Sequence, residues 1–191
     1  MDPEKKKRRL LDGMSAHVLE HGLSGASLRP LAKAVGTSDR MLIYHFGSKD
    51  RLVESLLVHI AGKLKLDLDA SLPPRRAASR MECVAEILAV LSRDEIAPFA
   101  RVWFDILSAA QKGDNVQKQI GHEIMASLHG WLMERLPESE TDAPATAMAL
   151  LALIEGLVVL NAVGHGEAAA ASIHLLLGSI SPFPQTGADH P

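Results

Sequence analysis

The feature that most constrains this chain is a series of helix-ending and helix-capping residues between positions 22 and 48. Gly22 ends a first amphipathic segment, and Gly36 suits the left-handed backbone that terminates a helix. Ser27, Ser38 and Ser48 are of the residue type that favours the position just before a helix. Between these positions, apolar residues recur every three or four places. The pattern predicts two short helices joined by a tight turn, with a longer helix on either side.

The composition favours helices throughout the chain. Hydrophobic residues make up 47% of the sequence but aromatic residues only 4%, and Ala and Leu dominate over the β-branched residues that strands prefer. Pro73 and Pro74 disfavour continued helix and mark a connection. We therefore predict an all-α protein of about nine helices, at residues 4–21, 28–35, 39–45, 49–68, 81–91, 98–110, 115–136, 145–163 and 167–179.

Charge is distributed unevenly along the chain. Residues 1–55 hold ten Lys or Arg against seven Asp or Glu, whereas the remainder holds ten against sixteen. Such a split suggests that the N-terminal end meets a polyanion, although a solvated face can carry as much charge. The basic run at residues 5–9 lies beside a phosphate backbone or forms a solvated helix end, and the sequence leaves these two alternatives open. A nuclear-localisation signal is a third interpretation, but it conflicts with the rest of the sequence.

The cysteine count and the N-terminus favour a cytoplasmic protein. Cys83 is the only cysteine, so no disulfide can form within one chain. Charged residues fill the first nine positions, which does not resemble a signal peptide. We expect a cytoplasmic location.

The stretch from residue 22 to residue 57 carries a specific resemblance. It reads GLSGASLRPLAKAVGTSDRMLIYHFGSKDRLVESLL, and its segments LAKAVGTS, YHF and GSKDRL occur in the order and spacing of the DNA-binding signature of TetR-type regulators. The predicted helix, turn and second helix can independently present the start of the second helix to a major groove. The sequence therefore resembles the TetR family of transcription regulators.

The recognition helix predicted at residues 39–45 has an exposed first turn and an inward face. Asp39 and Arg40 lie in that turn, whereas Leu42 and Phe46 are four residues apart and face inward. Arg40 can offer two donors to one guanine, and Asp39 either accepts from cytosine or stabilises the helix start. The resemblance implies that Arg29 contacts a base edge. It also implies phosphate contacts for five other residues, which are Thr37, Ser38, Tyr44, His45 and Lys49. The chain departs from the family pattern at Ile43, where an aromatic residue is usual.

The resemblance implies a homodimeric repressor of a palindromic operator, released by a small molecule, with no cofactor. Its domains would be a helix-turn-helix DNA-binding domain at 1–48, a ligand-binding and dimerisation domain at 49–180, and a disordered tail at 181–191. We expect a largely apolar effector. The candidate ligand-binding residues are Arg101, Trp103, Phe104, Met125, His129 and Asn161, although Met and aromatic residues at helical spacing more often simply pack.

The apolar stretch at residues 143–163 resembles the dimerisation helix of the family. Two small residues four positions apart allow a second helix to approach, and the expected dimer contacts are Ala152, Leu153, Gly156, Leu157 and Leu160. A membrane span is an alternative for this stretch. The charge of Glu155 argues against it, because an acidic residue at a bilayer centre costs roughly 2.5 kcal/mol or more.

Enzymatic and metal-dependent functions have no positive signal in this sequence. It contains no nucleophile elbow, zinc-protease motif, phosphate-binding loop or dinucleotide fingerprint. His122 and His129 are about 10 Å apart along a helix, and His17 with His21 make an incomplete metal site. We predict no catalytic or metal-binding residues, and keep a helical enzyme or a membrane-associated helical protein as alternatives.

A regulator of this kind would work by changing the spacing of two recognition helices. In a dimer they must sit about 34 to 36 Å apart, or a multiple of that, to enter successive major grooves. We hypothesise that a ligand bound among the middle helices shifts the helix at 49–68 and so changes this separation.

Overall fold

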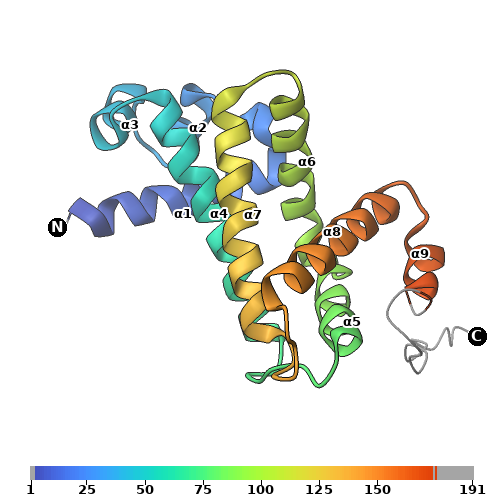
Figure 1. The fold of residues 1–191 in the computed structure, drawn as a ribbon. Coiled ribbons are helices and arrows are strands. Elements are labelled where there is room, and N and C mark those ends of the chain that lie inside the picture. Colours follow the sequence, from blue (N-terminus) through green and yellow to red (C-terminus); the bar gives the residue numbers. More distant parts are fainter. Residues whose placement is uncertain (1–2, 174, 176–191) are drawn as a thin grey trace, which may run out of the picture.

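The structure is entirely helical over the residues it describes, which are 3–173 and 175. In this computed structural model they form nine α-helices and two short 3-10 turns, with no strand among them. The prediction of an all-α protein of about nine helices is confirmed. Figure 1 shows a small N-terminal group of helices on one side and a larger group on the other.

The N-terminal group contains α1 (Pro3–His21), α2 (Leu28–Ala34) and α3 (Asp39–Phe46). The turn between α2 and α3 follows from two local features. Gly36 adopts φ 65°, a left-handed conformation that disfavours side chains with a Cβ. The Ser38 hydroxyl accepts a hydrogen bond from the Met41 N–H at 3.3 Å and so caps α3. The predicted pair of short helices is present.

Ser27 occupies the predicted N-cap position of α2. Ser27 does precede α2 and has extended backbone, but its side chain makes no capping hydrogen bond. Its backbone carbonyl instead accepts from the Leu31 N–H at 3.2 Å. The helix therefore begins at the expected residue without a bond to the Ser27 hydroxyl.

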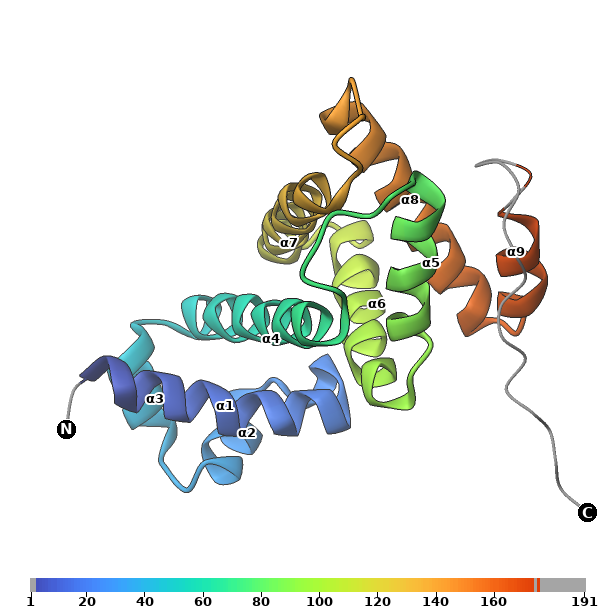
Figure 2. The same cartoon turned by 90° about the horizontal axis from the view of Figure 1, so that it is seen from below.

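Helix α4 (Lys49–Ser71) connects the two groups of helices. The Ser48 hydroxyl caps its start by accepting from the Arg51 N–H at 3.2 Å. Leu52 and Leu56 are fully buried near this start, where α4 packs against α1 and α3. Its later turns pack against α7, and α4 ends just before the two prolines, three residues beyond the predicted end. Figure 2 shows α4 lying between α1 and the larger group.

The larger group consists of α5 (Arg80–Leu91), α6 (Ala97–Gln111), α7 (Asn115–Arg135), α8 (Ala143–Ala162) and α9 (Gly166–Ser172). The bounds of α5 to α8 agree with the predicted ranges within two residues. Helix α9 starts one residue before its predicted start and ends at Ser172, and residues 174 and 176–179 of its predicted range lie outside the described residues. The predicted tail at 181–191 lies entirely outside them.

The end of α4 is bound to α7 by one carboxylate. An Asp69 oxygen accepts from Trp131 Nε1 at 2.7 Å and from Arg135 Nη2 at 2.6 Å. The Arg135 guanidinium also lies 4.7 Å from the centre of the Trp131 ring. These bonds and the charge of Arg135 outweigh the effect of burial and lower the pKa of Asp69. The C-terminal end of α4 is thus fixed to the larger group.

Cys83 is a core residue. Its side chain is buried in α5, and burial raises the pKa of the thiol to about 11. The thiol stays protonated at neutral pH and has no nucleophilic character.

Candidate nucleic-acid interface

Helix α3 presents its first turn to solvent and buries its opposite face. Asp39 and Arg40 are exposed, whereas Leu42 is fully buried and Phe46 is 9% exposed. Tyr44, between the two buried residues, is 77% exposed. The predicted inward orientation of Leu42 and Phe46 is confirmed. An uncharged aromatic side chain this exposed on a short helix is available to a partner.

The other side chains expected to contact DNA lie on the elements around α3. Arg29 is in the first turn of α2, Thr37 is in the turn before α3, and Lys49 is the first residue of α4. Arg29 and Lys49 are exposed, and Thr37 is half-buried. The Ser38 hydroxyl is exposed but accepts the capping bond described above, so it acts in the start of α3 itself.

His45 is less accessible than expected. Its Nε2 atom is enclosed and has no hydrogen-bond partner among the described residues. Burial lowers the pKa of the ring, and the positive charges of Lys6 and Lys7 lower it further. Both effects favour the neutral imidazole, and a contact with phosphate would have to use Nδ1 because Nε2 is enclosed.

A groove next to α2 is lined in part by Lys33, a basic side chain that the sequence analysis missed. The groove has a volume of about 550 Å³ and is lined by His17, Arg29, Pro30, Lys33 and Ala34. Lys33 is exposed and lies one turn beyond Arg29 on α2. The spacing of four residues was the available signal, since residues at i and i+4 share a helix face.

His17 and His21 do not form a metal site. Their rings are stacked at 4.3 Å between centroids, and the His21 Nδ1 atom pairs with the His17 carbonyl at 2.9 Å. Within the part of the chain that the structure describes, no group of three or more His, Cys, Asp or Glu residues could hold a metal ion.

Helix α6 joins the larger group to the N-terminal helices. The Asp105 carboxylate accepts from the Leu23 N–H at 2.8 Å, in the turn that follows α1. Arg101, one helical turn earlier, donates to the Glu20 carbonyl at 3.2 Å, near the C-terminal end of α1. Arg101 was expected in a ligand pocket. In the structure its exposed side chain instead contacts the C-terminal end of α1.

The remaining candidate ligand residues lie in three different places. Trp103 is half-buried and donates from Nε1 to a Glu155 oxygen of α8 at 2.7 Å. An added Cβ at Gly121 of α7 would lie 3.9 Å from two atoms of the Trp103 ring. His129 pairs with the Pro144 carbonyl at 2.9 Å, and Asn161 is exposed beside Gly166.

Trp103 therefore marks the place where α6 contacts both α7 and α8. Phe104 on α6 and Met125 on α7 are also half-buried. The sequence analysis used Glu155 only as an argument against a membrane span and missed it as a partner of Trp103. Burial raises the pKa of Glu155, and the bond from Trp103 offsets part of that rise. A partly desolvated carboxylate thus lies in an otherwise uncharged helix.

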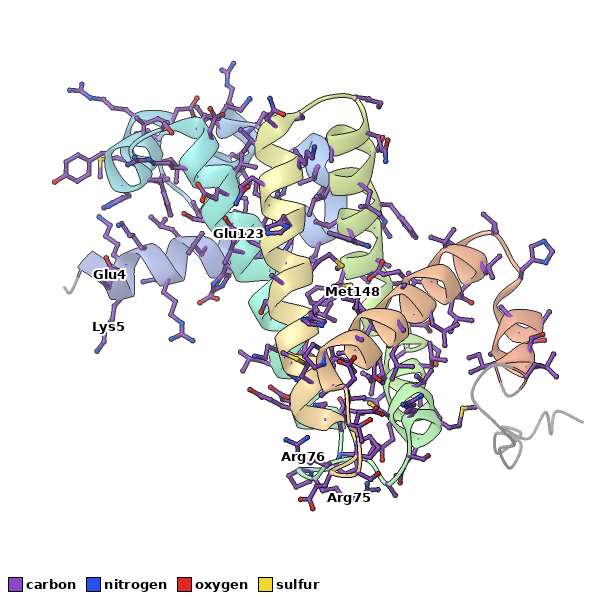
Figure 3. The ribbon with its side chains drawn as sticks, viewed as in Figure 1. Glu4, Lys5, Arg75, Arg76, Glu123 and Met148 are labelled. Carbon is purple, nitrogen blue, oxygen red and sulfur yellow. The ribbon has the colours of Figure 1, made fainter. Side chains whose placement is uncertain are left out.

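One face of α8 is apolar and exposed. Ala152, Gly156 and Leu160 lie on it, which matches three of the five residues expected in a dimer. Leu153 is half-buried, and Leu157 is 7% exposed because it packs into the core of its own protomer. The face also includes three large side chains that the sequence analysis missed, which are Met148, Val159 and Val163. Figure 3 labels Met148 on α8.

Comparison with known protein families identifies the family of this chain. Residues 15–56, which span the C-terminal end of α1 through the start of α4, match the family model described as "Bacterial regulatory proteins, tetR family". Residues 68–179 match the model described as "BetI-type transcriptional repressor, C-terminal". The second match alone covers more than half of the chain. The chain belongs to the TetR family.

Curated relatives of this TetR-family chain match it over most of their length. The HTH-type transcriptional regulator BetI of Burkholderia cenocepacia is 27% identical over 170 residues, which cover 85% of each chain. The BetI regulator of Brucella canis is 27% identical over 173 residues, 87% of this chain and 85% of the relative.

Solved structures show the same fold. A transcriptional regulator from Streptomyces coelicolor superposes with a TM-score of 0.69 at 23% identity, over 91% of this chain and 99% of the other. The multidrug-binding protein EbrR, in a structure of its complex with imidazole, superposes with a TM-score of 0.67 at 22% identity. The match covers 97% of this chain and 94% of EbrR. The sequence prediction of the family is confirmed.

Membership of the TetR family makes the chain a DNA-binding transcriptional regulator and not an enzyme. The alternative of a membrane span for α8 is not favoured. Helix α8 is long and apolar enough to cross a membrane by length and composition, and 28% of its most apolar window is buried in the protomer. Its exposed apolar face also suits another helix in a regulator of this family.

Proposed function

We propose that this protein is a cytoplasmic, homodimeric repressor that binds a palindromic operator and is released by a small molecule. The single observation that carries the proposal is the capped, exposed first turn of α3 inside a segment that matches the TetR DNA-binding model. The proposed units are a DNA-binding domain at 1–48, a ligand-binding and dimerisation domain at 49–180 and a tail at 181–191.

The proposed DNA contacts centre on α3. Arg40 reads a guanine and Asp39 accepts from a cytosine or stabilises the start of α3. Arg29 reaches a base edge from α2. The proposed phosphate contacts are those of Thr37, Ser38, Tyr44, His45 and Lys49. The exposure of Arg40, Tyr44 and Lys49 supports this arrangement.

The experiment that tests the proposal is a titration of the purified protein into labelled DNA from beside its own gene. It is made at several salt concentrations with unrelated DNA as competitor, and footprinting then locates the protected bases. Tight binding that resists the competitor and protects a palindrome is expected. Weak binding that is equal for all sequences would contradict the proposed operator.

Replacing Arg40 by alanine is expected to relax base preference at one position in each half-site. A guanidinium that binds guanine through two donors contributes about 1 to 3 kcal/mol of discrimination at that position. The measurement compares the affinities of the wild type and Arg40→Ala for operators with each base at every position. A uniform loss of affinity across all sequences would instead show that Arg40 touches only phosphate.

The effector is proposed to bind where α6, α7 and α8 meet, against Trp103, Phe104 and Met125. These side chains are half-buried and apolar over most of their surface, which favours an effector that is largely apolar. Trp103 and Glu155 supply the polar atoms there. EbrR, which shares the fold, is described as a multidrug-binding protein. Arg101, His129 and Asn161 make other contacts in this structure and would join the site only after a rearrangement.

Replacing Glu155 by glutamine is expected to stabilise the protein at neutral pH. The amide oxygen can still accept from Trp103, but the variant no longer has to bury a charge. The melting temperature should rise by a few degrees at pH 7. Because burial raises the pKa of Glu155 above its ordinary 4.5, the wild type loses stability as pH rises from about that value.

The difference in melting temperature between wild type and Glu155→Gln should therefore shrink as the pH falls toward 4. Scanning calorimetry of both proteins across this range makes the measurement. A melting temperature of the variant that is lower than wild type at pH 7 would show that the carboxylate is a net stabiliser.

Helix α6 is proposed to carry the effector's signal to the DNA-binding helices. It contacts α8 through Trp103 and binds the end of α1 and the following turn through Arg101 and Asp105. Asp69 fixes the C-terminal end of α4 to α7, so α4 is not free to move alone. We propose that α6 and α4 shift together and change the spacing of the recognition helices, with a coupling of roughly 1 to 3 kcal/mol.

A further inference from the structure

The first turns of α1 carry five consecutive cations, which we call the basic segment: Lys5, Lys6, Lys7, Arg8 and Arg9. Four of these side chains are exposed and Lys7 is half-buried. Lys7 lies 3.6 Å from Glu4, in a pair that is itself largely exposed. Figure 3 labels Glu4 and Lys5 at the end of α1 that projects from the molecule.

The stability of α1 does not account for the basic segment. Cations are unfavourable near the N-terminal end of a helix, where the backbone dipole is positive, and like charges three or four residues apart repel each other. Lys5 and Arg9 are four apart, and Lys6 and Arg9 are three apart. The fully buried apolar residues of α1, Met14 and Val18, come later in the helix. The segment therefore weakens the helix end that carries it.

The basic segment lies beside the recognition helix. Lys6 and Lys7 are close enough to His45 on α3 to lower the pKa of its ring, second only to burial. Figures 1 and 2 agree that this end of α1 is next to α3, far from α8 and α9. A duplex that receives the exposed turn of α3 in its major groove would bring its phosphates near the segment.

Charge complementarity identifies the partner. A quarter of the twenty Lys and Arg residues of the chain fall in these five positions, while the sequence after residue 55 has six more acidic than basic residues. The phosphate backbone of DNA is the polyanion that this family binds. Its approach would neutralise the repulsion within the segment and release condensed counterions.

We propose that the basic segment is a second phosphate-binding surface, which contacts the DNA backbone flanking the half-site that α3 reads. This inference rests on the operator binding proposed above and adds a contact outside the helix-turn-helix motif. The surface supplies affinity without base preference, because phosphate contacts carry no sequence information. It also makes the protected site longer than the bases that α3 reaches.

The test uses the full-length protein and two duplexes that contain the protected palindrome. One ends at the palindrome, and the other extends it by about one helical turn, roughly 10 base pairs, on each side. The variant Lys5→Gln with Arg9→Gln removes two exposed cations that lie one turn apart. The control variant, Lys63→Gln with Lys65→Gln, removes the same charge from α4. Circular dichroism verifies that all three proteins are folded.

Wild type and control should bind the extended duplex more tightly than the short one, whereas the Lys5 and Arg9 variant should show no such advantage. On the extended duplex the variant should lose affinity on the order of tenfold, and its dependence on log salt should become less steep by about 0.9 for each phosphate that it no longer neutralises. Its preference between operator and mutated operator should not change.

An unchanged salt dependence and an unchanged advantage of the long duplex in the variant would overturn the inference, as would an equal loss in the control. Wild-type binding to vesicles of equimolar phosphatidylcholine and phosphatidylserine, abolished in the variant while DNA binding is kept, would also overturn it in favour of a lipid surface. Failure of the wild type to prefer the palindrome over unrelated DNA would instead contradict the operator itself.

Discussion

Replacing Gly156 by glutamate is expected to convert the proposed dimer into monomers and to lower operator affinity by about 100-fold or more. Gly156 lies on the exposed apolar face of α8, where small residues allow a second helix to approach. A charged side chain there would be buried without a partner in the dimer. Two linked recognition helices bind one palindrome with a gain of roughly 10²-fold to 10⁴-fold over a single one.

The variant should nevertheless fold. An ideal Cβ at Gly156 meets no atom within 4 Å in the protomer, and glutamate has a higher helix propensity than glycine. Gly62→Glu is the matched control, because Gly62 is also exposed on a helix, α4, with nothing within 4 Å of an added Cβ. Sedimentation velocity at micromolar concentration and a titration of operator DNA make the measurement. A Gly156→Glu protein that remains a dimer would exclude this face as the interface.

The second large effect is expected from Leu42→Ala in the recognition helix. Leu42 is fully buried, and truncating a buried leucine to alanine costs about 2 to 5 kcal/mol. Helices α1, α2 and α3 bury few large side chains besides Leu42, so a loss of this size should unfold them at 37 °C and abolish operator binding. Chemical denaturation and DNA titration make the measurement.

The variant Tyr44→Ala distinguishes a loss of stability from the loss of a side chain that is proposed to contact DNA. Tyr44 lies two residues further along α3 but is 77% exposed, so its truncation should leave the free energy of unfolding within about 0.5 kcal/mol of wild type. Operator affinity should still fall, because the variant cannot make the proposed phosphate contact. If Leu42→Ala proved as stable as Tyr44→Ala, the inward face of α3 would not be the core that holds this helix.

Much of the fold was predictable because its signals are local. Ser38 and Ser48 cap the helices that follow them, Gly36 adopts the left-handed turn, and Leu42 and Phe46 point inward, as their spacing predicted. The ends were less certain. Helix α4 runs three residues past its predicted end, because only the approaching prolines limit it and Asp69 in its last turns gains bonds from α7.

The candidate ligand site was predictable only in part. Trp103 lies where α6 contacts α7 and α8, but Arg101 contacts α1 instead. A periodic pattern states that a residue lies on a given face of its helix. It does not state which neighbour that face meets, since this depends on how long helices cross.

The sequence by itself determined the all-helical class, the capped helix-turn-helix and the family resemblance, because capping, periodicity and turn chemistry act over a few residues. Only the tertiary structure decided that Asp105 binds the Leu23 N–H, 82 residues away, and that Glu155 meets Trp103, 52 residues away. The tertiary structure also placed the basic segment beside α3 and left one face of α8 uncovered. These features depend on helix packing, whose many small contacts no short stretch of sequence contains.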